Sequence, residues 1–147
     1  LGSEFLGQAS GGQWDLVPAP QGLRLEDSEA IGAFVGKCEP KWIINAAAMT
    51  NVDAAHLDPE RALQVNGLAP GVLAGTAQEV GARVIHISSE AVYDGSTQLP
   101  YTEADACRPV SVYGVSKLTG DLVTLTYSPE SYVLRTSWLY SGQRGSN

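Results

Sequence analysis

Cysteine is scarce in this chain of 147 residues: Cys38 and Cys107 lie far apart and match no metal-binding spacing. Two reduced thiols are usual in a cytoplasmic protein, so we expect a cytoplasmic location, no disulfide framework and no metal ion. His56 and His86 are isolated and are interpreted as structural histidines. Basic residues are scarce too, with nine Lys and Arg against 16 Asp and Glu, a net charge of −7 and no basic cluster. Because binding to a phosphate backbone needs a Lys/Arg footprint, this composition argues against a nucleic-acid partner.

Long hydrophobic runs are missing as well, so the sequence contains neither a bilayer-spanning stretch nor a signal segment, and we expect no membrane association. The apolar fraction of 44% and the charged fraction of 17% are those of an ordinary soluble protein, and the length suits one domain. Residues 1–5 resemble a cloning remnant, so the predicted domain covers residues 6–147. The chain stops at Asn147, shortly after a strand-like segment, without a further helix or domain to close it.

Strands and helices are predicted to alternate along the chain. Apolar runs predict strands at 42–45, 84–87 and 132–134, the first of them buried. Periodicity and capping residues predict helices at 28–37, 58–65, 70–80 and from Arg108-Pro109 to about 125, with Ser28 as a cap and Asn66-Gly67 as a break. Strands that are apolar on both faces suit a parallel sheet that helices cover on both sides. The alternation therefore predicts a three-layer α/β sandwich.

Small and polar residues follow the first two predicted strands, where open α/β sheets bind their ligands. Asn45-Ala46-Ala47-Ala48 lets a flat ligand approach the backbone closely, because its side chains are small. Ser88-Ser89 ends the next strand, although two serines in such a place are more often turn residues. The polar loop at 90–106 has a length that is usually functional in a compact domain. Asn66, polar in an apolar context, is expected to bond to backbone.

Tyr113 and Lys117 stand four residues apart in a predicted helix, which puts them on the same helical face. An ammonium held near a phenol favours the phenolate, so we expect Lys117 to lower the pKa of Tyr113 and make it a better proton shuttle. With six tyrosines and three lysines in the chain, chance alone supplies this spacing often. The pair gains meaning only from what accompanies it.

The glycine-rich stretch near the N-terminus is the hardest part to interpret. Gly7, Gly11 and Gly12 follow the apolar pair Phe5-Leu6, but their order does not give the spacing of a phosphate-binding turn. A degenerate dinucleotide loop and a flexible terminus therefore both stay open.

Four longer motifs and one pair together resemble the dTDP-4-dehydrorhamnose reductase family, within the extended short-chain dehydrogenase/reductase superfamily. They are N-A-A-A-M-T-N-V-D (45–53), Val65-Asn66, H-I-S-S-E-A-V-Y-D-G (86–95), V-Y-G-V-S-K-L-T-G (112–120) and L-R-T-S-W-L-Y (134–140). The resemblance covers residues 27–147, with the motifs in order and at family-like spacing. It implies a Rossmann-like domain, here incomplete at both ends, with the C-terminal substrate-binding half absent.

The resemblance implies NADPH- or NADH-dependent reduction of the 4-keto group of dTDP-4-dehydro-6-deoxy-L-mannose to dTDP-L-rhamnose. In that reaction Tyr113 would donate a proton to the carbonyl oxygen, Lys117 would bond the nicotinamide ribose, and Ser89 would polarise the carbonyl. The matching motifs also assign a sugar-nucleotide contact to Glu90 and Trp138. They assign cofactor contacts to Tyr113, Lys117, Ala48, Met49, Thr50, Gly7 and Gly11. A homodimer is compatible with this resemblance, and the oligomeric state stays open.

The sequence also departs from the family pattern. The glycine fingerprint is scrambled, and the region between it and Asn45 is shorter by about a dozen residues, so the usual acidic residue for the adenosine ribose is missing. Ala91 and Met49 stand where aromatic rings are common. Two alternatives therefore stay open besides a fragment without activity: a non-catalytic relative similar to the regulatory subunit of methionine adenosyltransferase, and a sugar-nucleotide epimerase.

Overall fold

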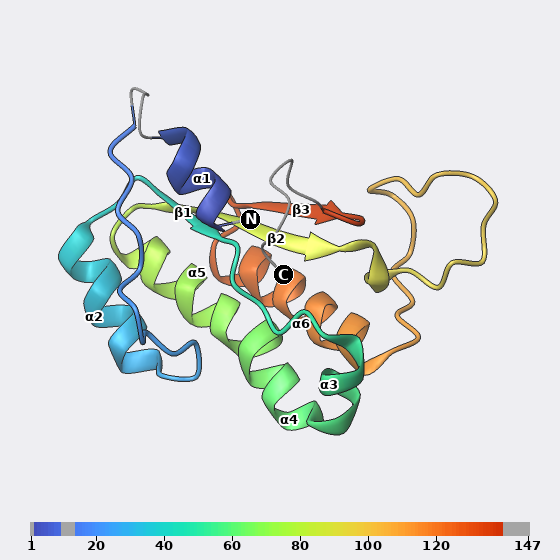
Figure 1. Cartoon of the computed structure of the whole chain (residues 1–147). Helices are drawn as coiled ribbons and strands as arrows, with labels where there is room; N and C mark the ends of the chain where they lie inside the picture. The colour runs from blue at the N-terminus through green and yellow to red at the C-terminus, as the bar shows by residue number, and fades with distance from the viewer. Residues whose placement is uncertain (1, 10–13, 140–147) are drawn as a thin grey trace.

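The computed structural model describes residues 2–9 and 14–139 (Figure 1). Its sheet is formed by β1 (Trp42–Asn45), β2 (Arg83–Ser89) and β3 (Tyr132–Thr136). Its α-helices are α1 (Gly2–Ala9), α2 (Ser28–Cys38), α3 (Val52–Leu57), α4 (Pro59–Ala62), α5 (Ala69–Glu79) and α6 (Val112–Tyr127). A π-helix, η1 (Leu63–Leu68), joins α4 to α5, and a short 3₁₀ helix, η2 (Glu90–Val92), follows β2.

The three strands are parallel and lie in the order β1-β2-β3, so each neighbouring pair is joined by a crossover connection. Ile44 pairs with Ile85, which pairs with Tyr132, so the side chains at these positions share one face of the sheet. Figure 1 shows α5 and α6 on one side of the sheet and α1 on the other. The prediction of a Rossmann-like α/β fold is confirmed.

Small side chains bring α5 and α6 close to the sheet and to each other. Val84 of β2 is fully buried and packs in one cluster with Ala74 and Ala77 of α5. A Cβ atom at Gly71 would lie 3.1 Å from the Val123 side chain, so α5 and α6 approach closely at this glycine. Close packing of small residues thus forms the interior on this side of the sheet.

The prediction that β1 is buried is wrong for half of its residues. Ile43 packs against the core that α2 and α5 form, and Asn45 is buried. Trp42 and Ile44 point to the opposite face and are 40% and 38% exposed. Successive side chains of a strand alternate between the faces, so a run that is apolar throughout still exposes every second residue where one face is open.

Three details of the helices also differ from expectation. Asp27, not Ser28, caps α2, because its Oδ1 accepts a hydrogen bond of 2.9 Å from Ala30 N. Helix α6 begins at Val112 rather than at Pro109, and Ser111 is its N-cap. Asn66 and Gly67 do not break the helix: the chain stays helical through them as the π-helix η1.

Within residues 2–9 and 14–139, no helix is long and apolar enough to cross a membrane.

Candidate active site

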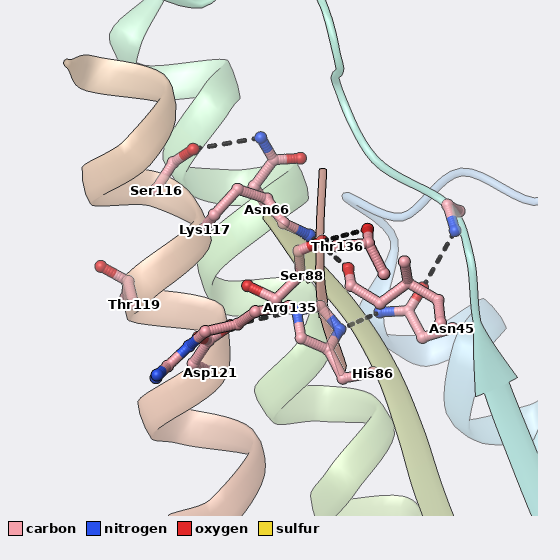
Figure 2. Close-up of polar contacts among 12 residues, drawn as sticks. Asn45, Asn66, His86, Ser88, Ser116, Lys117, Thr119, Asp121, Arg135 and Thr136 are labelled. Carbon is pink, nitrogen blue, oxygen red and sulfur yellow. Dashed lines mark hydrogen bonds and ion pairs between the residues drawn. The ribbon is translucent and has the colours of Figure 1, made fainter. Parts of the chain in front are cut away.

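The carboxyl ends of the three strands meet at one edge of the sheet, and α6 brings two further side chains to it. Asn45, Ser89 and Thr136 end β1, β2 and β3. Figure 2 shows Lys117 of α6 directed toward this edge, beside Ser88 and Thr136. The Thr136 hydroxyl donates to the Ser88 carbonyl oxygen at 3.1 Å, which ties the ends of β2 and β3 together.

Ser89 and Tyr113, far apart in the sequence, lie near each other at this edge. The Ser89 hydroxyl lies close enough to the Tyr113 phenol to lower the pKa of that phenol, and Ser89 is 8% exposed. The Ser89 hydroxyl also caps η2, accepting from Ala91 N at 3.2 Å, and it donates to Glu90 Oε2 at 2.9 Å. A hydroxyl has one proton, so in this structure the proton of Ser89 is directed to Glu90.

The pKa of Tyr113 is raised above its usual value by burial, with a further increase from the nearby Glu90 carboxylate and an opposing effect of the Ser89 hydrogen bond. The expectation that Lys117 lowers this pKa is therefore wrong for this structure. The reason is that the ammonium of Lys117 is directed to the backbone of β2. A raised pKa keeps the phenol protonated near neutral pH, which is the state that a proton donor needs.

Lys117 is 1% exposed, and its Nζ donates to the Ile87 carbonyl oxygen at 2.7 Å. Burial lowers the pKa of Lys117 to about 8, against the opposing effect of the Asp121 carboxylate. An ammonium has three N–H bonds, so this contact leaves donors for ribose hydroxyls. Because the side chain is so well covered, a ribose reaches those donors only if the neighbouring chain moves.

Asn66 joins the loop after β1 to the helix that carries Tyr113. Its Oδ1 accepts from Met49 N at 2.8 Å, and its Nδ2 donates to Met49 O and to Ser116 Oγ, both at 3.0 Å. Ser116 in turn donates to the Tyr113 carbonyl oxygen at 2.7 Å. The sequence indicated that Asn66 bonds to backbone, but not that it links the predicted cofactor loop to α6.

Sequence reasoning missed a group of buried charged and polar side chains behind Lys117. Asp121 is fully buried and accepts a hydrogen bond of 3.0 Å from Arg135 Nε (Figure 2). His86 is fully buried, and burial is the main cause that lowers its pKa to about 3, so the ring is neutral. The position of Asp121, four residues after Lys117, could have indicated this group, because both residues then share one face of α6.

The remaining predicted site residues that the structure describes are more exposed than Ser89 and Lys117 or lie away from this edge of the sheet. Ala48 and Met49 are half-buried in the loop after β1, and Thr50 is exposed. Trp138 follows the end of β3 and is 89% exposed. Gly7 lies inside α1, where a Cβ atom would meet nothing within 4 Å, so it forms no phosphate-binding turn. Gly11 lies outside the described residues.

In the part of the chain that the structure describes, no three His, Cys, Asp or Glu side chains gather as a metal-binding group. Cys38 and Cys107 are both free thiols.

The match to known proteins is strong. The family described as RmlD substrate binding domain matches residues 1–147. The chain belongs to this family. Two relatives of this RmlD-family chain are the dTDP-4-dehydrorhamnose reductases of Escherichia coli (strain K12) and Mycolicibacterium smegmatis. The first is 40% identical over 119 residues, 81% of this chain and 40% of the relative. The second is 40% identical over 124 residues, 84% of this chain and 37% of the relative.

Solved structures of reductases are similar to this RmlD-family chain as well. The dTDP-4-dehydrorhamnose reductase of Clostridium acetobutylicum has a TM-score of 0.91 and 34% identity, over 97% of this chain and 51% of that chain. The reductase of Bacillus anthracis, solved in complex with NADP, has a TM-score of 0.92 and 28% identity, over 99% of this chain and 52% of that one. The chain thus spans about half the length, or less, of these proteins.

Proposed function

We propose that this chain is the dinucleotide-binding part of an NAD(P)H-dependent reductase of a dTDP-4-dehydro-6-deoxy sugar, acting in the cytoplasm on the route to dTDP-L-rhamnose. The observation that carries the proposal is the meeting of Ser89 and Tyr113 at the carboxyl edge of the sheet, one helical turn from Lys117. The names of the relatives support the same reaction.

The proton-donating role follows from the environment of Tyr113. Its pKa is raised by burial, so the phenol is protonated before the substrate carbonyl arrives. Ser89 lies next to it and can donate a second hydrogen bond to the same carbonyl oxygen. For that, the Ser89 proton must leave Glu90 Oε2, where it now lies at 2.9 Å. Substrate binding therefore exchanges the Ser89–Glu90 contact for a Ser89–carbonyl contact.

A nicotinamide cofactor, when bound, supplies the hydride for this reduction. The residues toward its nicotinamide end fit such a group: Lys117 keeps N–H donors beyond its bond to Ile87, and Asn66 holds Met49 by both backbone groups. Small Ala48 precedes Met49 and leaves the backbone open to a flat ring. Trp138 and Glu90, at the same edge, are the residues we assign to the sugar nucleotide.

One observation favours the second candidate, a non-catalytic relative that acts by binding a partner. Lys117 is 1% exposed, so a ribose cannot reach it without movement of the chain. A relative that had lost cofactor binding would keep such a closed site. Cofactor binding separates the two candidates.

The test is the thermal unfolding of this chain with NADPH and with NADH, in wild type and in Lys117→Met. Ligand at 100 times its Kd stabilises the folded state by about 2.7 kcal/mol, so the wild-type melting temperature should rise by several degrees. Lys117→Met should lose most of that rise, and Lys41→Met, a change at an exposed lysine, should keep it. A melting temperature that neither cofactor moves at millimolar concentration would overturn the reductase proposal and favour the binding role.

A further inference from the structure

Asp121 occupies the third of three successive positions on one face of α6. Tyr113, Lys117 and Asp121 are spaced by four residues, so each side chain lies one turn beyond the last. Tyr113 and Lys117 belong to the site proposed above, whereas Asp121 is part of no role assigned so far. It is fully buried, which is costly for a carboxylate and calls for a physical reason.

The carboxylate of Asp121 is held in place from the sheet. Its Oδ2 accepts from Arg135 Nε at 3.0 Å, and Arg135 Nη1 donates to the Tyr93 hydroxyl at 2.8 Å. The Arg135 guanidinium also lies over the Tyr93 ring, 5.3 Å from its centroid. Two contacts on Tyr93 fix the direction of Arg135, so Arg135 in turn fixes Asp121.

The other carboxylate oxygen faces the interior. Asp121 Oδ1 lies 3.9 Å from His86 Nε2. Burial raises the pKa of the Asp121 carboxyl, and the Ser88 hydroxyl and the Arg135 and Lys117 cations oppose this effect. The His86 ring is neutral, and its Nδ1 faces the Asn45 amide, 3.1 Å from Nδ2 (Figure 2). His86 therefore brings no positive charge to Asp121, and the cations that act on this carboxylate are Arg135 and Lys117.

Within the described residues, two cations and one carboxylate lie in the interior between α6 and the sheet. Lys117 comes from α6 and Arg135 from β3, and both are cations. The neutral or weakly ionising groups that face them are His86 and Ser88 from β2 and Tyr93 and Cys107 from the loop after it. Asp121 is the carboxylate that acts on both cations. Burial by itself favours the neutral amine of a lysine, and a fixed anion one turn away opposes this effect.

We propose that Asp121 is a positioning residue for the Tyr113–Lys117 pair: anchored by Arg135, its buried carboxylate is the counter-charge that keeps the Lys117 amine protonated, while the Ile87 carbonyl oxygen holds that amine at 2.7 Å. The catalytic meaning of this role rests on the proposed function, in which a protonated Lys117 bonds the ribose. The charge coupling itself does not depend on the reaction, so it can be tested in this chain without cofactor or substrate.

The experiment is a nuclear magnetic resonance titration of the side-chain amines in the chain labelled at lysine. The chain has three lysines, and Lys37 and Lys41 are exposed, so they serve as internal references. Lys117 should lose its proton near pH 8 in the wild type. In Asp121→Asn the anion is gone, so the Lys117 titration should move down by about one pH unit or more while both references stay. Asp53→Asn, the same charge change at an exposed site on α3, should move none of them.

A second measurement needs no variant, so it holds even if Asp121→Asn fails to fold. In the wild type labelled at aspartate, the carboxyl resonance of Asp121 should show an inflection at the pH where Lys117 titrates. A flat Asp121 resonance through that step, or a folded Asp121→Asn chain with an unmoved Lys117 titration, would overturn the proposal. Neither result depends on NADPH binding, so failure here and failure of the reductase proposal are distinguishable.

Discussion

The two faces of the sheet are built in opposite ways. The face toward α5 and α6 is covered, yet it buries the polar side chains of His86 and Ser88 beside a single fully buried valine on β2, Val84. The other face, on the side where α1 lies, holds large apolar side chains that remain partly exposed, among them Tyr132 at 54% and Leu134 at 46%. Hydrophobic residues inside and polar residues outside would be the usual arrangement, whereas this sheet buries polar side chains next to its apolar core and leaves large apolar ones partly exposed.

The difference follows from what each face does. A charged group that takes part in chemistry must be held away from water and in one geometry, which the helices on the covered face provide. On the other face the rings of Trp42 and Tyr132 are stacked with centroids 6.0 Å apart, and the Arg83 guanidinium lies 5.6 Å from the Trp42 ring centroid. Under the proposed function, the buried charges of the site account for the polar interior of the covered face.

The largest effect is expected where the covered face is tightest. A Cβ atom at Gly120 of α6 would lie 2.2 Å from the Asn66 carbonyl oxygen and 3.2 Å from His86 Nε2. Because the first of these atoms is backbone, it cannot move aside as a side chain would. Gly120→Ala should therefore reduce the free energy of unfolding by about 4 kcal/mol or prevent folding, as measured by urea denaturation.

The matched control is Gly75→Ala on α5, where an added Cβ atom meets nothing within 4 Å. Alanine is the better helix former, so this variant should gain about 0.5 to 1 kcal/mol. Equal losses at Gly120 and Gly75 would show that α6 does not pass the π-helix as closely as described.

His86 gives the next largest effect, through pH. Its pKa is about 3 in the folded state against a usual 6.5, mainly because burial disfavours the charged ring. Between these values the unfolded chain binds a proton that the folded chain does not, so His86 makes the folded state less stable as pH falls below 6.5. Between pH 6.5 and 4.5 the loss should be roughly 2 kcal/mol. Chemical denaturation across this range measures it.

The variant His86→Gln isolates this contribution from that of the carboxylates. Its stability should fall less steeply with acid than that of the wild type. His56→Gln, a change at an exposed histidine, should leave the wild-type slope intact. A His86→Gln slope equal to that of the wild type would mean that the buried ring accepts a proton without cost.

The sequence predicted the elements of the covered face well, because its signals are local. Periodicity indicated α2, α5 and α6, and the apolar runs indicated all three strands. Spacing and resemblance predicted Ser89, Tyr113 and Lys117 as site residues, and the structure places Ser89 near Tyr113. Each of these inferences depends either on residues that are close in the chain or on motifs that occur in the same order as in a known family.

The parts that the sequence did not predict depend on contacts between distant segments. Arg135 contacts Asp121 of α6 and Tyr93 of the loop after η2, and the local spacing of Lys117 and Asp121 does not indicate that Arg135 joins them. The direction of Lys117 toward Ile87, which leaves the pKa of Tyr113 raised, depends on how α6 lies on β2. The exposure of Trp42 and Ile44 depends on which face the helices cover, and an apolar run contains no information about that.

The smallest expected effect tests the two faces directly. Val84→Ala removes two methyl groups from the cluster with Ala74 and Ala77 and should cost about 2 kcal/mol of unfolding free energy, because the cavity cannot close. Leu134→Ala removes more carbon but should cost less than about 1 kcal/mol, since the leucine is already 46% exposed. The urea midpoints of the two variants, compared at equal m-values, show which face contributes more to the free energy of unfolding. If Leu134→Ala proved as costly as Val84→Ala, the open face would be covered in solution, and the contrast between the two faces would be lost.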